Sequence, residues 1–160
     1  KKDYGMTSKI NNRLKTLGIV LPEAAAPVAN YAPYTITNNL VFISGQIPFV
    51  DGNIKYPGRL GENITITEAQ EAARLCGINL IAQLNNACGG NLDRLTQVVK
   101  ITGFVSSTPD FTDQAIVING TSDLMFEVFE NKGRHARAAI GCSALPLGAA
   151  VEVDAIFEIS

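Results

Sequence analysis

The stretch RHARAAIGCSALPLGAAVEVDAIFEIS, residues 134–160, decides the fold. It holds two runs of small and β-branched residues, 135–144 and 149–159, separated by the turn sequence Leu-Pro-Leu-Gly at 145–148. The second run alternates apolar and polar side chains, which is typical of a strand with one buried face. The stretch therefore predicts two strands.

Strand periodicity divides the reactive side chains of this stretch between two faces. In the first run Arg137 and Ala139 share one face, while Cys142 lies on the other with Ile140. We expect the Ile140 face to pack under helices, which puts Arg137 on the open face of the sheet. In the second run the polar face includes Glu152. Arg137 and Glu152 are thus predicted to lie together, provided that the two strands pair.

This pair allows two interpretations. Charged residues are mostly exposed, so the face can be a solvated strand surface with an incidental ion pair. Alternatively, Arg137 clamps a carboxylate through two parallel hydrogen bonds, and Glu152 holds or deprotonates a water molecule. His135 has no serine, cysteine or metal partner that the sequence can assign, so we expect a bystander at the start of the strand. Arg134 is expected to be a surface charge.

Upstream signals complete a single α+β domain over residues 1–160. Asn38-Asn39 predicts a hairpin turn, and Thr65 with Glu68 predicts a capping box for a long helix that ends at Gly89-Gly90. The helices should cover one face of the sheet, and the open face should find a partner, so we expect a homo-oligomer. The expected elements are a helix over 7–17, two strands flanking Asn38-Asn39, a helix over 66–88, a strand over 95–107 and a helix over 114–130.

Composition narrows the function classes. The net charge of −2 and a pI near 5.4, without a basic run, argue against a nucleic-acid partner. Three cysteines and one histidine do not suit a zinc site and predict free thiols in a reducing cytoplasm, with Cys76 in the core. No apolar run approaches the roughly 20 residues of a membrane span, and the basic start lacks the apolar region of a signal peptide.

Four motifs together resemble the YjgF/RidA family, also named endoribonuclease L-PSP and reactive intermediate/imine deaminase. The resemblance runs from about Pro27 to Ile159, and the first helix and the 55–63 loop look like the longer branch of the family. It implies a chorismate-mutase-like α+β fold, a homotrimer around a central barrel, and ligand clefts between adjacent subunits. The motifs are LVFISGQIP (40–48), INGTSDLMFEVF (118–129), HARAAIG (135–141) and LPLGAAVEVDAI (145–156).

The resemblance also implies an activity: hydrolysis of small enamine and imine carboxylates, such as 2-aminoacrylate and 2-iminobutanoate, to 2-oxo acids and ammonia without a cofactor. The carboxylate-anchoring arginine of the family matches Arg137, and its water-orienting glutamate matches Glu152. Ala139 stands where the family often has a cysteine, which alters the shape and polarity of the pocket. The other matched pocket positions are Tyr31, Ser44, Gly45 and Asn119.

Other functions stay open at this stage. The family name suggests an endoribonuclease, although the acidic pI argues against it. Ala139 favours a non-catalytic regulatory trimer that binds small carboxylates. A chorismate mutase is supported by fold analogy alone.

Overall fold

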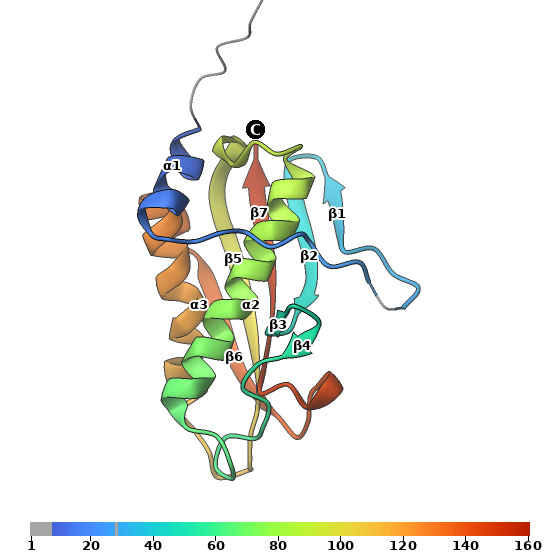
Figure 1. Cartoon of the computed structure of the whole chain (residues 1–160), viewed down its shortest axis with the longest axis vertical. Helices are drawn as coiled ribbons and strands as arrows, with labels where there is room; N and C mark the ends of the chain where they lie inside the picture. Colours follow the sequence, from blue (N-terminus) through green and yellow to red (C-terminus); the bar gives the residue numbers. More distant parts are fainter. Residues whose placement is uncertain (1–7, 28) are drawn as a thin grey trace, which may run out of the picture.

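The computed structural model describes residues 8–27 and 29–160, and its main feature is a five-stranded mixed sheet with the order β1-β2-β7-β5-β6. Helices α2 (Ile66–Ala87) and α3 (Gln114–Phe129) lie side by side against one face of this sheet (Figure 1). The expected α+β layering, with both long helices on a single face, is confirmed. The strands are β1 (Tyr34–Thr37), β2 (Leu40–Gln46), β5 (Leu95–Ser106), β6 (Ala136–Cys142) and β7 (Val151–Ile159).

The centre of the sheet is β7, which pairs antiparallel with β2 on one side and with β5 on the other. Strand β6 lies at the edge and pairs parallel with β5. The prediction that rests on pairing of the last two strands is therefore wrong, because β5 lies between them. Helix α3 supplies the crossover that a parallel β5–β6 pair needs, and adjacency in sequence does not reveal on which side of β5 the next strand is added.

The hairpin at Asn38-Asn39 forms as predicted, and Asn38 adopts the positive φ of +51° that such a turn requires. A second, small hairpin joins β3 (Phe49–Val50) to β4 (Asn53–Ile54) through Asp51-Gly52. Both turns use residues that tolerate left-handed backbone, which is why the turn at Asn38-Asn39 could be predicted from the sequence.

Helix α2 begins with the predicted capping signature. The Thr65 hydroxyl accepts a hydrogen bond from the Glu68 amide at 3.1 Å and donates one to the Glu68 carboxylate at 2.9 Å. Cys76 lies on the apolar stripe of this helix and is fully buried, so the expected core thiol is confirmed. The stripe comprises Ala69, Ala73, Cys76, Leu80 and Leu84.

The short helix α1 (Lys9–Thr16) lies beside α3, and the segment after it crosses over α2 towards β1 (Figure 1). Ser8 caps α1, and Gly18 ends it with a φ of +69°, as the sequence suggests; the predicted start at Thr7 lies outside the described residues. The buried Gln83 of α2 donates to the Ala25 carbonyl at 2.8 Å, which fastens the crossing segment to the helix.

Helix α3 lies unusually close to its neighbours. A Cβ added to Gly120 would overlap the backbone carbonyl of Gln70 in α2, and one added to Gly103 in β5 would overlap the Ile118 side chain of α3. These two glycines therefore set the depth at which α3 packs. This depth also decides what fits beneath α3 on the edge strand.

Candidate functional site

Arg137 reaches from the edge strand β6 to helix α3. Its Nη1 donates to Asn119 Oδ1 at 2.8 Å and to Ser122 Oγ at 3.1 Å, and its Nη2 donates to the Ala115 carbonyl at 3.3 Å. All three acceptors belong to one side of α3, because positions 115, 119 and 122 are spaced by one helical turn. The helix thus holds the guanidinium from one direction.

Arg137 consequently lies on the helix side of the sheet, and not on the open face as predicted. Ala139, two residues later, packs against the core, whereas Ile140 is 47% exposed. Cys142 lies on the same face as Ile140. Burial, and to a smaller extent the charge of Glu152, raises the pKa of the Cys142 thiol. The alternation within the strand was predicted correctly, but the two faces were exchanged.

The reason for the exchange is the close approach of α3. Over Gly103 the Ile118 side chain leaves room for small neighbours only, so the position beside it on β6 is Ala139. The larger Ile140 occupies the open face, where it pairs in register with Phe104. The size of each side chain therefore determines which face of β6 lies under α3, and a prediction from hydrophobicity alone gives the opposite orientation.

The guanidinium of Arg137 keeps two donors available. Three of its five N–H groups are engaged by α3, which leaves the Nε–H and one Nη2–H without an acceptor among residues 8–27 and 29–160. Two N–H donors on these adjacent nitrogens are what a carboxylate accepts in a bidentate pair. The arrangement suits an anionic ligand that approaches from outside the chain.

His135 is connected to Arg137 through a serine. Its Nε2 lies 2.9 Å from Ser122 Oγ, and its Nδ1 lies 2.6 Å from the Gly133 carbonyl. The location just before β6 is as predicted, and the structure adds a serine partner, Ser122, that the sequence alone does not assign. Ser122 and His135 are separated by about two turns of α3 and the short segment Glu130–Gly133, so no local sequence signal joins them.

Glu152 lies on the open face near the beginning of β7, against the backbone of β2. A Cβ added to Gly45 would lie 2.6 Å from Glu152 Oε1, so the carboxylate needs a glycine at this position. The β2–β7 register shifts between Ile43 and Gln46, and such irregularities often border functional sites. Burial, followed by the charge of Asp154, raises the pKa of Glu152 and makes it a stronger base.

Ser44 fastens the loop that carries Tyr31 to the same end of β2. The Ser44 hydroxyl donates to the Ala32 carbonyl at 2.7 Å, and its amide donates to the Pro33 carbonyl at 3.0 Å. Tyr31 itself is 50% exposed. Tyr31, Ser44, Gly45 and Glu152 therefore form one group, on the part of the sheet that contains β2 and β7.

The predicted residues thus fall into two separate half-sites within one chain. The arginine half-site consists of Asn119, Arg137 and Ala139 beneath α3, and the glutamate half-site consists of Tyr31, Ser44, Gly45 and Glu152. Strands β6 and β7 are two positions apart, about 10 Å, and Arg137 and Glu152 point to opposite faces. One chain alone cannot bring both side chains to the same small ligand.

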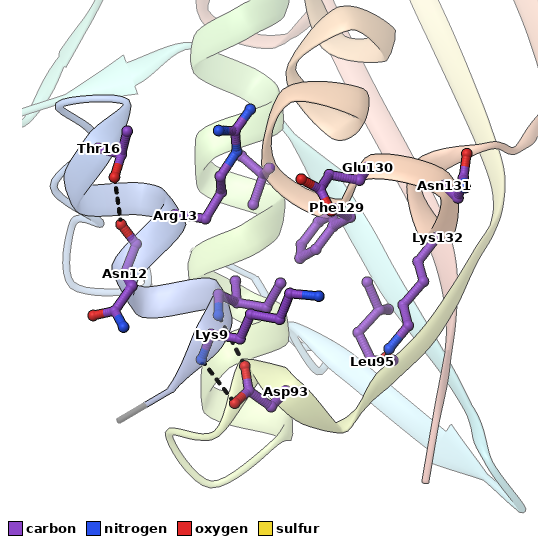
Figure 2. Close-up of a pocket in the computed structure, with 12 residues that line it drawn as sticks. Lys9, Asn12, Arg13, Thr16, Asp93, Leu95, Phe129, Glu130, Asn131 and Lys132 are labelled. Carbon is purple, nitrogen blue, oxygen red and sulfur yellow. Dashed lines mark hydrogen bonds between the residues drawn. The ribbon is translucent and has the colours of Figure 1, made fainter. Parts of the chain in front are cut away.

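A cavity of about 560 Å³ lies elsewhere, between α1 and the end of α3 (Figure 2). Its residues include Lys9, Arg13 and Lys132, and it shares none with the two half-sites. Asp93 points into the first turn of α1, where it accepts hydrogen bonds from the Lys9 and Ile10 amides at 3.0 and 2.9 Å. The acidic group here is already used to hold the helix in place.

Over residues 8–27 and 29–160 no helix is long and apolar enough to cross a membrane. Within the same ranges no three histidine, cysteine, aspartate or glutamate side chains are grouped closely enough to share a metal ion.

Comparison with known proteins shows close relatives over nearly the whole chain. A family model described as YjgF/chorismate mutase-like, with endoribonuclease in the same description, matches residues 11–159. Protein TCP17 of Trypanosoma cruzi is 46% identical over 155 residues, which is 96% of both chains. A 2-iminobutanoate/2-iminopropanoate deaminase of Rattus norvegicus is 27% identical and covers 84% of this chain and 83% of its own.

The fold has a close match among solved structures. Protein Atu1372 from Agrobacterium tumefaciens, described as of unknown function, superposes with a TM-score of 0.88 at 47% identity. The match covers 94% of this chain and 92% of the other.

Proposed function

Because this chain belongs to the YjgF/chorismate mutase-like family, we propose that it hydrolyses small enamine or imine carboxylates to 2-oxo acids and ammonia. The observation that carries the proposal is the pre-aimed guanidinium of Arg137. Three of its donors are fixed by α3 and two remain for a ligand carboxylate. The deaminase names of distant relatives support the reaction class.

The substrate class follows from what the two half-sites offer. A bidentate carboxylate on Arg137 fixes one end of a small molecule and orients the neighbouring C=N carbon. An enamine reaches the same point once its carbon takes up a proton and its nitrogen releases one, which gives the imine. Ala139 leaves the space beside Arg137 small and apolar, which suits a short aliphatic side chain.

Glu152 supplies the base in this mechanism. Its carboxylate takes a proton from a water molecule, whose oxygen forms a bond to the imine carbon while the C=N electron pair moves to nitrogen. That proton is then delivered to the nitrogen, which gives an amine beside the new hydroxyl group. Glu152 next carries the hydroxyl proton to the amine nitrogen, the C–N bond breaks, and ammonia leaves as the C=O bond forms. Burial beside Gly45 raises the pKa of Glu152 in the direction that favours proton abstraction.

The complete site requires two copies of the chain. We propose that the arginine half-site of one subunit meets the glutamate half-site of the next, in a head-to-tail ring that closes as a homotrimer. Exposed Phe42 and Ile140 give the open sheet face an apolar surface that such a ring would cover. The described cysteines Cys76, Cys88 and Cys142 are all free, in keeping with the cytoplasmic location that we propose.

The direct test is ammonia release from freshly generated 2-iminobutanoate. We expect the purified protein to accelerate it, and Arg137→Ala to reduce kcat/KM at least a hundredfold, since both positioning and charge are lost. Arg134→Ala removes an exposed arginine three residues away and should leave the rate unchanged. No acceleration by the wild-type protein, or equal rates for Arg137→Ala and wild type, would refute the proposed reaction.

A second function, a non-catalytic trimer that binds small carboxylates, is favoured by Ala139 at the position where a thiol is common in related proteins. The arginine half-site would then retain its ligand without turnover. Calorimetric binding of 2-oxobutanoate by a protein that is silent in the ammonia assay would identify this function.

A further inference from the structure

We infer that Ser122 and His135 are positioning residues that hold Arg137 in its ligand-binding orientation. The binding of a carboxylate by Arg137 is part of the proposed function, and the inference rests on it. The role of Ser122 and His135 follows from a continuous series of hydrogen bonds in the structure. That series runs from the Gly133 carbonyl through His135 and Ser122 to the Arg137 guanidinium.

For the neutral imidazole ring, the direction of every hydrogen bond in this series follows from its acceptors. A carbonyl oxygen can only accept, so His135 Nδ1, 2.6 Å from the Gly133 oxygen, carries a hydrogen. In the neutral ring Nε2 is then an acceptor, and Ser122 Oγ donates to it at 2.9 Å. With its hydrogen committed to His135, the Ser122 oxygen presents lone pairs to Arg137 Nη1 at 3.1 Å.

This direction gives His135 a specific role. A serine hydroxyl that is free to rotate can turn its hydrogen towards the guanidinium and weaken the contact. The histidine removes this freedom, because its Nε2 takes the hydroxyl hydrogen. Ser122 is 8% exposed, so few water molecules can compete for the same hydrogen. The tilted contact of the His135 ring with Phe126, at 6.1 Å between ring centroids, holds the imidazole plane in place.

The same pair could be mistaken for a nucleophile and its base. Serine and histidine within 2.9 Å, with the second ring nitrogen oriented by an acceptor, are the geometry that activates a serine. Ser122 is buried, however, and its oxygen already contacts the Arg137 guanidinium, which leaves no open approach for a substrate carbon. The geometry therefore favours positioning over nucleophilic attack.

The first experiment is nitrogen-15 NMR of the imidazole ring, which gives one set of signals because the chain has one histidine. At mildly alkaline pH we expect Nδ1 to carry the hydrogen and Nε2 to show the shift of a hydrogen-bonded acceptor. In Ser122→Ala the Nε2 signal should move towards that of an acceptor without a donor. Rotation about the Cζ–Nη1 bond of Arg137, assigned with Arg137→Lys, should become faster.

The second experiment compares two substitutions of His135, to glutamine and to asparagine, by their effect on ligand affinity. Glutamine can reach Ser122 with an acceptor oxygen at the place of Nε2, whereas asparagine is too short and retains only the contact near Gly133. For the 2-oxobutanoate complex we expect Kd to rise on the order of tenfold in Ser122→Ala and in His135→Asn, since a hydrogen bond to a charged group is lost. His135→Gln should stay within about threefold of wild type, and Arg134→Ala should not change Kd.

The outcomes distinguish this inference from the proposed function. The double variant Ser122→Ala/His135→Asn should bind no more weakly than either single variant, because the two residues act in series. Additive losses, equal effects of asparagine and glutamine, or labelling of Ser122 by a fluorophosphonate would overturn the positioning role. If wild type neither binds 2-oxobutanoate nor accelerates ammonia release, the proposed function fails. Unchanged ring shifts and Arg137 rotation in Ser122→Ala would overturn the inference separately.

Discussion

At the scale of single residues, the contact between Gly45 and Glu152 connects backbone shape to chemistry. The glutamate carboxylate occupies the space where any other residue at position 45 would place its Cβ. The position of the carboxylate therefore depends on the absence of a side chain at position 45. For this reason a glycine at position 45 indicates that Glu152 can take up this position.

The pH dependence of the reaction should report on Glu152. The base acts in its ionised form, and burial together with the charge of Asp154 raises its pKa. We therefore expect kcat/KM to fall on the acid side with a midpoint above that of an ordinary glutamate. Asp154→Asn removes the neighbouring charge and should move the midpoint to lower pH, while Glu158→Gln on the same strand should not. A midpoint that Asp154→Asn leaves in place would contradict this assignment.

A methyl group at position 45 should disturb Glu152 while the fold persists. The Cβ of Gly45→Ala would lie 2.6 Å from the end of a flexible side chain, which can turn away at little cost in stability. We expect at least a tenfold loss of kcat/KM, since the water molecule loses its base position. Gly45→Ala combined with Glu152→Gln should be no slower than Glu152→Gln alone. Multiplying losses would show that Gly45 acts independently of the glutamate.

At the scale of elements, helix α1 is held by a carboxylate from a distant turn. Burial raises the pKa of Asp93, but the hydrogen bonds from Ile10, Lys9 and Ser8 outweigh it, and the net pKa is lowered. A folded-state pKa below the unfolded value means that this stabilisation is present above the unfolded pKa. It is lost as the pH falls through the lower, folded value.

This capping contact can be tested on α1 alone. In Asp93→Asn we expect the Lys9 and Ile10 amides to exchange faster with solvent at neutral pH, with a loss of about 1 kcal/mol in the stability of α1. In wild type the Ile10 amide shift should titrate with a midpoint below that of an ordinary aspartate. Asp123→Asn, on the exposed side of α3, is the matched control and should change neither quantity.

The packing depth of α3 gives a second prediction about elements. The Cβ of Gly120→Ala would overlap backbone atoms of α2, which cannot move aside as a side chain can. We expect a loss of about 1–3 kcal/mol in the free energy of unfolding, measured with denaturant, although alanine favours helices more than glycine does. The control Asp123→Ala also introduces alanine into α3, but at an exposed position, and should stay within about 0.5 kcal/mol.

Most helices, strands and turns could be predicted from local sequence signals. Which face of β6 lies under the helices could not be predicted in this way. Turns at Asn38-Asn39 and caps at Thr65 depend on neighbours in sequence, so the sequence contains their cause. The face on which Arg137 lies depends on how deeply α3 packs over Gly103, which involves residues far apart in the chain. The contact between Ser122 and His135 is hidden for the same reason.

At the scale of the whole molecule, two half-sites on different faces predict complementation between inactive variants. Arg137→Ala and Glu152→Gln should each be inactive alone, because every site lacks one partner. After unfolding and refolding together in equal amounts, about one quarter of sites should combine an intact arginine with an intact glutamate. We expect a corresponding return of ammonia release. Mixtures that stay inactive, although exchange of subunits is verified by mass spectrometry, would show that no site is shared between chains.

The central position of β7 has a consequence for synthesis of the protein. The β1–β2 hairpin and the β5–α3–β6 unit are made earlier in the sequence, yet they touch through β7. Until the ribosome has released residues 151–159, β2 and β5 cannot be joined by strand pairing, and we expect each to have an unpaired edge where β7 will lie. Such edges invite association with other chains. We therefore expect the strand that carries Glu152 also to close these edges and so to end the period in which the nascent protein is most prone to aggregation.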